Sequence, residues 1–251
     1  MADHPESDRE QSFLDHLVEL RTRLIRALLS VLVVLVCLLP FARQLYEAVA
    51  APLMARLPAG SNMIAIDVAS PFLTPFKLSL LVAIMVSMPF IIYQLWAFVA
   101  PALFKHEKRL ARPLLFSSIV LFYAGCAFAY FVVFPLVFGF LTRIAPEGVE
   151  MMTDISKYLD FVTTLFLAFG ITFEVPIATI ILVATGLTTA DKLAAIRPYV
   201  IVGAFALGML LTPPDVISQT LMAIPMWMLY EVGILFSRVL LKSDRPGHAT
   251  N

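Results

Sequence analysis

Three carboxylates lie where an acidic side chain could bind a cationic ligand or a polar helix. Glu19 occurs in FLDHLVELRTRL, Glu107 in WAFVAPALFKHEKRLARP and Glu174 in FLAFGITFEVPIATIIL. A carboxylate accepts two parallel hydrogen bonds from a guanidinium, so these groups favour recognition of arginine. What each can do depends on the element that carries it.

Glu19 has two interpretations. At helical spacing Asp15, Glu19 and Arg23 share one face, and apolar residues line another. One interpretation is an amphipathic helix on the inner membrane surface, in which the Glu19–Arg23 pair contributes about 0.2–0.5 kcal/mol. The other is that Glu19 offers its carboxylate to an external cation, which the like-charged neighbour Asp15 slightly favours.

Glu107 is a single acid among four bases in a segment approached by aromatic and proline residues. A basic loop on the inner side of a membrane explains the bases. It does not explain the neighbouring apolar set, which is Phe98, Pro101, Leu103 and Phe104. An apolar patch beside a carboxylate suits a ligand with one basic and one apolar end.

Glu174 lies near the middle of a long apolar stretch. An ionisable group at that depth costs some 2.5 kcal/mol or more, so we expect it to face protein or water. It is either a hydrogen-bonded group in helix packing, loosened by Pro176, or part of a polar notch. Glu231, nearer a helix end, can reach the interface more easily.

The turn TPPD joins two short apolar segments. Thr212 and Asp215 belong to this turn, and Met209 and Gln219 flank it. A plain hairpin accounts for the turn. The polar spot at the ends of two short helices is also typical of a place where another membrane helix forms hydrogen bonds.

Composition places these residues in a membrane protein. Of 251 residues, 60% are hydrophobic and 14% charged, and the mean hydropathy is +0.89. Soluble domains average roughly 45–50% apolar and about 25% charged residues, so an ordinary soluble enzyme is excluded. The formal net charge of +0 excludes a global field for nucleic acid.

The sequence predicts an all-α protein that forms one membrane domain over residues 1–251. A bilayer core of about 30 Å needs roughly 20 apolar helical residues. The segment between Pro198 and Pro213 is shorter than that, so we expect the fifth helix, and with it the sixth, to be short. The predicted spans are 24–41, 73–99, 113–140, 158–187, 199–212 and 216–236, between a cytoplasmic N-terminal segment 1–23 and a cytoplasmic tail 237–251. An outer segment around Pro52 is predicted as a short interfacial helix.

Lys and Arg set the expected orientation. With the N-terminus inside, 13 of the 18 Lys and Arg residues fall on inner segments. Both termini are therefore expected in the cytoplasm.

The residue inventory argues against catalysis. The four histidines fall in tails and loops without metal-ligand spacing, and no nucleotide-binding or nucleophile motif occurs. We expect no enzyme activity, cofactor or metal. Cys37 and Cys126 lie in apolar runs and are expected to pack as small apolar residues.

Several long segments together resemble the TatC family, the multi-spanning receptor of the twin-arginine protein translocase. They are FLDHLVELRTRL, SNMIAIDVASPFLTPFKL, WAFVAPALFKHEKR, AYFVVFPLVFGFL, FGITFEVPIA and RPYVIVGAFALGMLLTPPDVISQTLMAIPMW. The similarity runs from about Ser12 to Arg238. It implies six spans in a cupped, glove-like arrangement within the bacterial cytoplasmic membrane.

The resemblance also implies roles for individual residues. Signal-peptide binding falls to Glu19, Glu107, Arg21, Arg23, Phe98, Pro101 and Leu103. Glu174 matches an intramembrane polar site. The residues implied in docking of the single-span partners TatB and TatA are Met209, Thr212 and Gln219. Pro52 and Asp215 match sensitive outer-loop positions. The implied function is transport of folded proteins driven by the proton-motive force, with self-association in a larger complex and contact with lipid.

Two other classes are weighed against this. A secondary transporter or ion channel using Glu174 predicts a second intramembrane charge and paired broken helices, and neither is visible. An intramembrane hydrolase would need a nucleophile and base at depth, and no predicted span contains histidine.

Overall fold

The computed structural model describes residues 5–54, 64–103, 111–137, 139, 154–211 and 216–242. Nearly all of these residues are helical, as the apolar stretches predict. Two compact units form: residues 1–56 with 68–102, and residues 57–67 with 103–251. Each unit is described by itself below.

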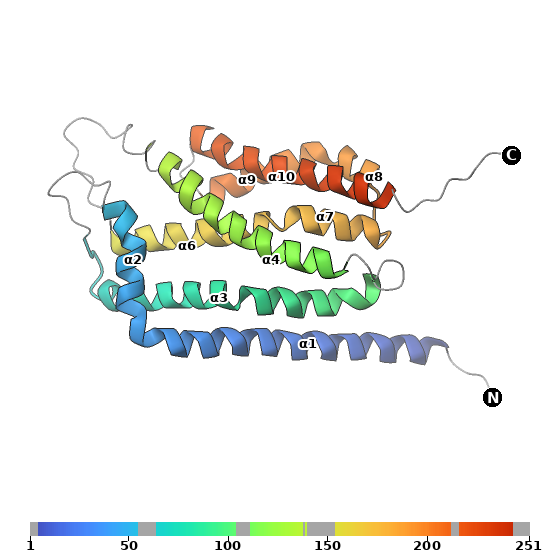
Figure 1. Cartoon of the computed structure of the whole chain (residues 1–251), viewed down its shortest axis with the longest axis horizontal. Coiled ribbons are helices and arrows are strands. Elements are labelled where there is room, and N and C mark those ends of the chain that lie inside the picture. The colour runs from blue at the N-terminus through green and yellow to red at the C-terminus, as the bar shows by residue number, and fades with distance from the viewer. Residues whose placement is uncertain are drawn as a thin grey trace. The chain divides into compact units, whose positions relative to one another are not determined.

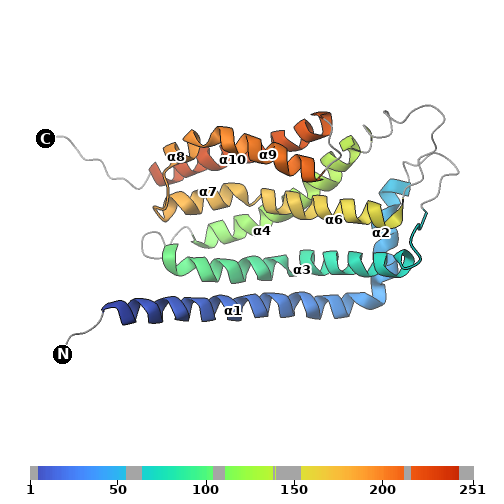
Figure 2. The same ribbon diagram turned by 180° about the vertical axis from the view of Figure 1, so that it is seen from behind.

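The first unit holds three α-helices. They are α1 (Pro5–Leu38), α2 (Ala42–Met54) and α3 (Ser70–Leu103), with a short 3₁₀ turn at Leu39–Phe41. Helices α1 and α3 run side by side, and α2 crosses at the end of α1 (Figures 1 and 2). The predicted lead-in helix and first span therefore form one continuous helix. Pro40 lies at the bend that follows it, where its ring suits the start of a new turn.

Helix α1 is apolar but almost unpacked. The candidate membrane segment His16–Ala48 runs from α1 into α2 and is long enough to span a bilayer, yet only 6% of its most apolar window is buried. Leu35 is the buried apolar side chain among those described in this helix. Its remaining apolar surface suits lipid or another helix rather than a protein core.

The second unit contains the remaining helices. They are α4 (Ala111–Phe128), a π-helical turn (Ala129–Val133), α6 (Ile155–Thr172), α7 (Val175–Ala184), α8 (Ala190–Ala195), α9 (Arg197–Leu211) and α10 (Val216–Lys242). Helix α10 packs against α7 and α9, and α4 packs against α6. Helices α6 and α7 follow one another end to end (Figure 1).

Glycines bring these helices into close contact. A Cβ atom at Gly125 on α4 would lie 2.4 Å from the carbonyl oxygen of Phe169 on α6. A Cβ at Gly233 on α10 would lie 2.1 Å from Oγ1 of Thr179 on α7. Small residues at helix interfaces are the usual means by which membrane helices approach closely.

The observed helices refine the predicted spans. Five helices among the described residues are long and apolar enough to cross a membrane, and α9 is a shorter apolar helix. Its 15 residues extend about 22 Å, in agreement with the short fifth span. Helix α10 has 27 residues and continues to Lys242, but its apolar segment, Gln219–Val239, is the shortest of the five candidate spans at 21 residues, in agreement with a short sixth span. Helix α8 was not predicted.

Asp154 fastens the start of α6. Its Oδ1 accepts hydrogen bonds from the backbone N–H of Ser156 at 2.8 Å and of Lys157 at 2.9 Å. Its Oδ2 accepts one from the N–H of Ile66 at 3.0 Å, beside an isolated bridge between Ile64 and Asp154. The N–H groups of Ile66, Lys157 and Ser156 hold the pKa of this carboxyl below its usual value, because they favour the charged form.

We predict that Asp154→Ala lowers the midpoint of thermal unfolding near neutral pH, because it removes the acceptor for three N–H groups. A carboxyl with a depressed folded pKa stabilises the fold above its unfolded pKa and loses that contribution as the pH falls through the folded pKa. The gap between wild type and variant, measured in detergent, should therefore narrow below about pH 4.

Thr189→Ala is the matched control for this prediction. Thr189 caps α8 by accepting the N–H of Lys192, and its hydroxyl does not titrate. Thr189→Ala should lower the midpoint of thermal unfolding by the same amount near neutral pH and below about pH 4. An Asp154→Ala gap that stays constant down to acid pH would contradict the assignment.

Candidate functional site

The structure describes some of the residues predicted to bind a signal peptide, and others lie outside the described set. Glu19, Arg21 and Arg23 lie on α1, and Phe98 lies on α3 within the same unit. Pro101 and Leu103 belong to the last turn of α3, but their side chains are outside the described set, and Glu107 lies outside the described residues.

Glu19 is held by its own helix through one oxygen. Arg23 donates to Oε1 from Nε at 3.0 Å and also from Nη2. The other oxygen, Oε2, accepts no hydrogen bond from the described residues. The side chain of Glu19 is 37% exposed and that of Arg23 is 21% exposed. Glu19 thus presents a fixed, accessible carboxylate with one oxygen open to a further donor.

His16 joins this carboxylate to α3. Its ring stacks on Phe98 with centroids 4.2 Å apart and an interplanar angle of 18°. Its Nδ1 lies 3.8 Å from Oε2 of Glu19, which is too long for a hydrogen bond. One imidazole therefore lies near two predicted site residues, with its face on Phe98 and its Nδ1 towards Glu19.

Sequence reasoning missed His16. We expected the histidines in tails and loops, whereas His16 lies within α1. Its position one helical turn before Glu19 is the local signal that could have found it. The contact with Phe98 joins two distant parts of the chain and leaves no local pattern.

Glu174 occupies the break between α6 and α7. Phe173 and Glu174 interrupt the two helices, and Pro176 lies in the first turn of α7. Ser118 on α4 donates its hydroxyl to Oε2 of Glu174, whereas Oε1 is buried and has no partner among the described residues. A buried acceptor without a donor is costly, so this atom marks a place where a further donor would be stabilising.

Residues predicted to dock partner helices lie where α9 ends and α10 begins. Met209 on α9 is 54% exposed. Gly208 lies beside α10, since a Cβ there would be 3.4 Å from the carbonyl oxygen of Gln219. Met209 and Gln219 are thereby held at adjoining helix ends. Thr212 and Asp215 lie outside the described residues, and Pro52 lies in α2 with its side chain undescribed.

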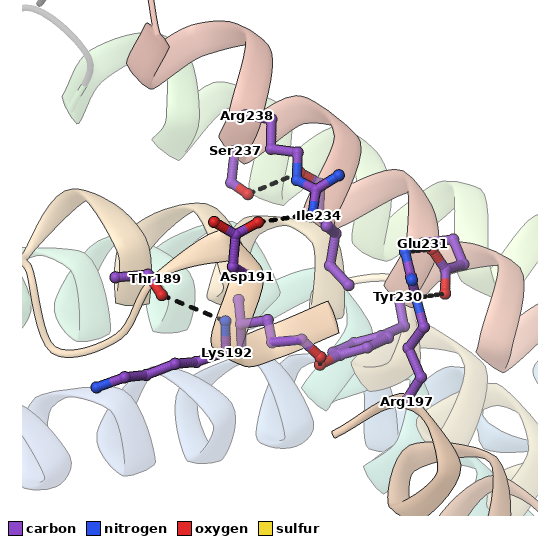
Figure 3. A network of polar contacts seen from close by, with 10 residues as sticks. Thr189, Asp191, Lys192, Arg197, Tyr230, Glu231, Ile234, Ser237 and Arg238 are labelled. Carbon is purple, nitrogen blue, oxygen red and sulfur yellow. Dashed lines mark hydrogen bonds and ion pairs between the residues drawn. The ribbon is translucent and has the colours of Figure 1, made fainter. Parts of the chain in front are cut away.

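At the other end of this hairpin, charges are paired between elements. Arg197 at the start of α9 donates from Nε and Nη2 to the two carboxylate oxygens of Glu231, at 2.6 and 2.8 Å (Figure 3). Arg238 on α10 donates to Asp191 on α8 at 2.9 Å. The hydroxyl of Tyr230 donates to the carbonyl oxygen of Leu193 at 2.7 Å. Glu231 is thus paired with a base, where the sequence suggested only that it reaches the interface.

The groups at these sites can bind a ligand by charge and shape. Among the described residues, no group of three or more His, Cys, Asp or Glu side chains could hold a metal ion. The described geometry offers carboxylates, an aromatic pair and a hydroxyl. These are groups that recognise a cationic or polar segment.

Comparison with known proteins assigns the family. Residues 15–225 match the family described as Sec-independent protein translocase protein (TatC). The TatC protein of Azotobacter chroococcum mcd 1 is 54% identical over 98% of this chain and 96% of its own length. That of Escherichia coli strain K12 is 57% identical over 94% of this chain and 91% of its own length.

A solved structure agrees with these relatives. The crystal structure titled Twin Arginine Translocase Receptor TatC superposes with a TM-score of 0.80 at 39% identity and covers 90% of this chain and 99% of that one. The all-α membrane fold expected from the sequence is confirmed, and neither alternative class is favoured. This chain belongs to the TatC family of Sec-independent protein translocase proteins.

Proposed function

We propose that this protein is the receptor subunit of a twin-arginine translocase and binds the signal peptides of folded cargo. The support from relatives is the solved structure of TatC, a twin-arginine translocase receptor. The observation that carries the proposal in this chain is the Glu19 carboxylate, which Arg23 holds through one oxygen and whose other oxygen lies near His16, the ring that stacks on Phe98.

Recognition of paired arginines follows from the shape of the guanidinium. It is planar and donates two parallel hydrogen bonds to a carboxylate, whereas a lysine ammonium is a point charge without this fork. Glu19 and Glu107 would each accept one guanidinium. Phe98, Pro101 and Leu103 would contact the apolar part of the signal, and Arg21 and Arg23 would set the geometry around Glu19.

The proposed setting is the bacterial cytoplasmic membrane with both termini in the cytoplasm. The distribution of Lys and Arg supports this orientation. It places the Glu19 site on the side from which newly made proteins arrive. Transport itself would be driven by the proton-motive force and would need no catalytic group in this chain.

TatA and TatB are proposed to dock where α9 meets α10. Met209 is exposed there, and Gln219 and Thr212 would offer hydrogen bonds to a single-span helix. Pro52 and Asp215 are proposed to shape the outer loops, and self-association would complete the larger complex. The nearly unpacked helix α1 offers surface for lipid or for such partners.

We predict that a peptide with an Arg-Arg signal binds membrane vesicles carrying the complete translocase, and that its Lys-Lys twin binds much more weakly. Glu107→Gln should weaken Arg-Arg binding by roughly 1–3 kcal/mol, because it removes a charged acceptor. Fluorescence titration of labelled peptide measures both. Equal affinity for the two peptides would overturn the receptor proposal, and an unchanged affinity in Glu107→Gln would remove that residue from the site.

Glu174 is proposed to line a polar notch that admits water or a polar segment at membrane depth. Two observations support this: its Oε1 is buried with no partner among the described residues, and its Oε2 accepts a hydrogen bond from the hydroxyl of Ser118. A transporter using Glu174 would need a second ionisable group nearby, whereas the polar contact seen here is with a serine.

We predict that Glu174→Cys, in a chain whose Cys37 and Cys126 are replaced by serine, reacts with a water-soluble maleimide in membranes. Ile171→Cys is the matched control, because Ile171 lies one helical turn earlier and is an exposed apolar side chain. It should stay inert, because lipid excludes the reagent. Complete inertness at position 174 would indicate buried helix packing instead of a notch.

A further inference from the structure

We infer that His16 is a positioning residue of the arginine-binding site, which holds the Glu19 carboxylate and the Phe98 ring in register. This inference rests on the proposed function and names a residue that neither the sequence motifs nor the family resemblance had assigned. It is carried by the stacked contact between α1 and α3.

The stack is the described ring contact that ties the first half of α1 to α3. The rings are nearly parallel at 18° with centroids 4.2 Å apart. Among residues 16–34 no side chain is fully buried and several are half-buried, so apolar packing restrains this part of α1 only weakly. Stacking with Phe98 is therefore a main restraint on where α1 presents Glu19.

The same imidazole faces the open oxygen of Glu19. Nδ1 of His16 lies 3.8 Å from Oε2, while Arg23 occupies Oε1. The carboxylate thus lies between two groups of its own helix, one turn on either side. An incoming guanidinium that uses Oε2 would meet the carboxylate and the His16–Phe98 rings together.

This juxtaposition favours arginine over lysine. A guanidinium is flat and weakly hydrated, so it can stack on an aromatic surface while its N–H groups reach a carboxylate. An ammonium gains less from the flat surface. Loss of the His16 ring should therefore reduce arginine binding more than lysine binding.

The alternative is that the stack only stabilises the packing of α1 on α3. It predicts a lower unfolding temperature without a change in selectivity between the two peptides. Selectivity is therefore the readout that separates a positioning role from a purely structural one.

The test compares His16→Gln, which removes the ring but keeps a polar side chain, with His16→Phe, which keeps a ring and removes the imidazole nitrogens. Val18→Ala is the matched control, since Val18 is an exposed neighbour on α1 outside the proposed site. Each full-length variant is titrated with Arg-Arg and Lys-Lys signal peptides in vesicles that carry the complete translocase. Thermal unfolding checks that each variant is folded.

We expect His16→Gln to weaken Arg-Arg binding about two- to tenfold, as expected for the loss of a stacked aromatic pair, with little change for the Lys-Lys peptide. His16→Phe should retain most of the wild-type selectivity, and Val18→Ala should match wild type. If His16→Gln does not fold, a cycle of His16→Leu, which also removes the ring, Phe98→Leu and the double variant replaces it. The double variant should then lose no more affinity than Phe98→Leu alone.

Three results would overturn the inference. They are unchanged selectivity in folded His16→Gln, an equal loss in His16→Phe, or additive losses in the cycle. Each of these leaves the receptor proposal intact as long as the wild type prefers Arg-Arg. If the wild type shows no such preference, the receptor proposal itself fails.

Discussion

The hydrocarbon interior of a bilayer supplies no hydrogen-bond partners, and this constraint decides how the chain holds its polar groups. Threonine hydroxyls inside the helices donate hydrogen bonds to backbone carbonyls one turn earlier, as Thr172 does to Ala168 at 2.7 Å. Glu174, a carboxylate at the break between α6 and α7, accepts a hydrogen bond from the hydroxyl of Ser118 on α4. Its Oε1 has no partner among the described residues, and we place a functional notch at this carboxylate.

Charged side chains of α8, α9 and α10 also have partners within the protein. Arg197 pairs with Glu231 through both carboxylate oxygens, and Arg238 pairs with Asp191, so α8, α9 and α10 are joined at one end by groups of opposite sign. Removing one partner would leave the other charge partly desolvated. The glycine contact of Gly208 with α10 holds the other end of the hairpin. Together these contacts fix the short helix α9 beside α10, where partner helices are proposed to dock.

How much of this follows from sequence differs by element. Long apolar stretches sufficed to predict most helices, because length and hydropathy are local properties, and the short fifth helix followed from Pro198 and Pro213. The continuity of α1, the six-residue helix α8 and the π-helical turn at Ala129–Val133 did not follow, because they depend on caps and on packing. Glu19 could be nominated from its motif, but the stack of His16 on Phe98 and the pairing of Arg197 with Glu231 join residues far apart in sequence. Only the folded chain brings them together.

The central claim is that the Glu19, His16 and Phe98 region receives the arginine pair of a signal peptide. Photo-crosslinking tests it most directly, with a photo-reactive phenylalanine analogue in place of Phe98. The control places the same analogue at Phe90, an exposed residue about two turns earlier on α3. The account predicts that the analogue at position 98 crosslinks an Arg-Arg precursor in native membranes, that the Lys-Lys precursor gives little product, and that position 90 gives little with either. Equal yields from the two precursors at position 98 would contradict it.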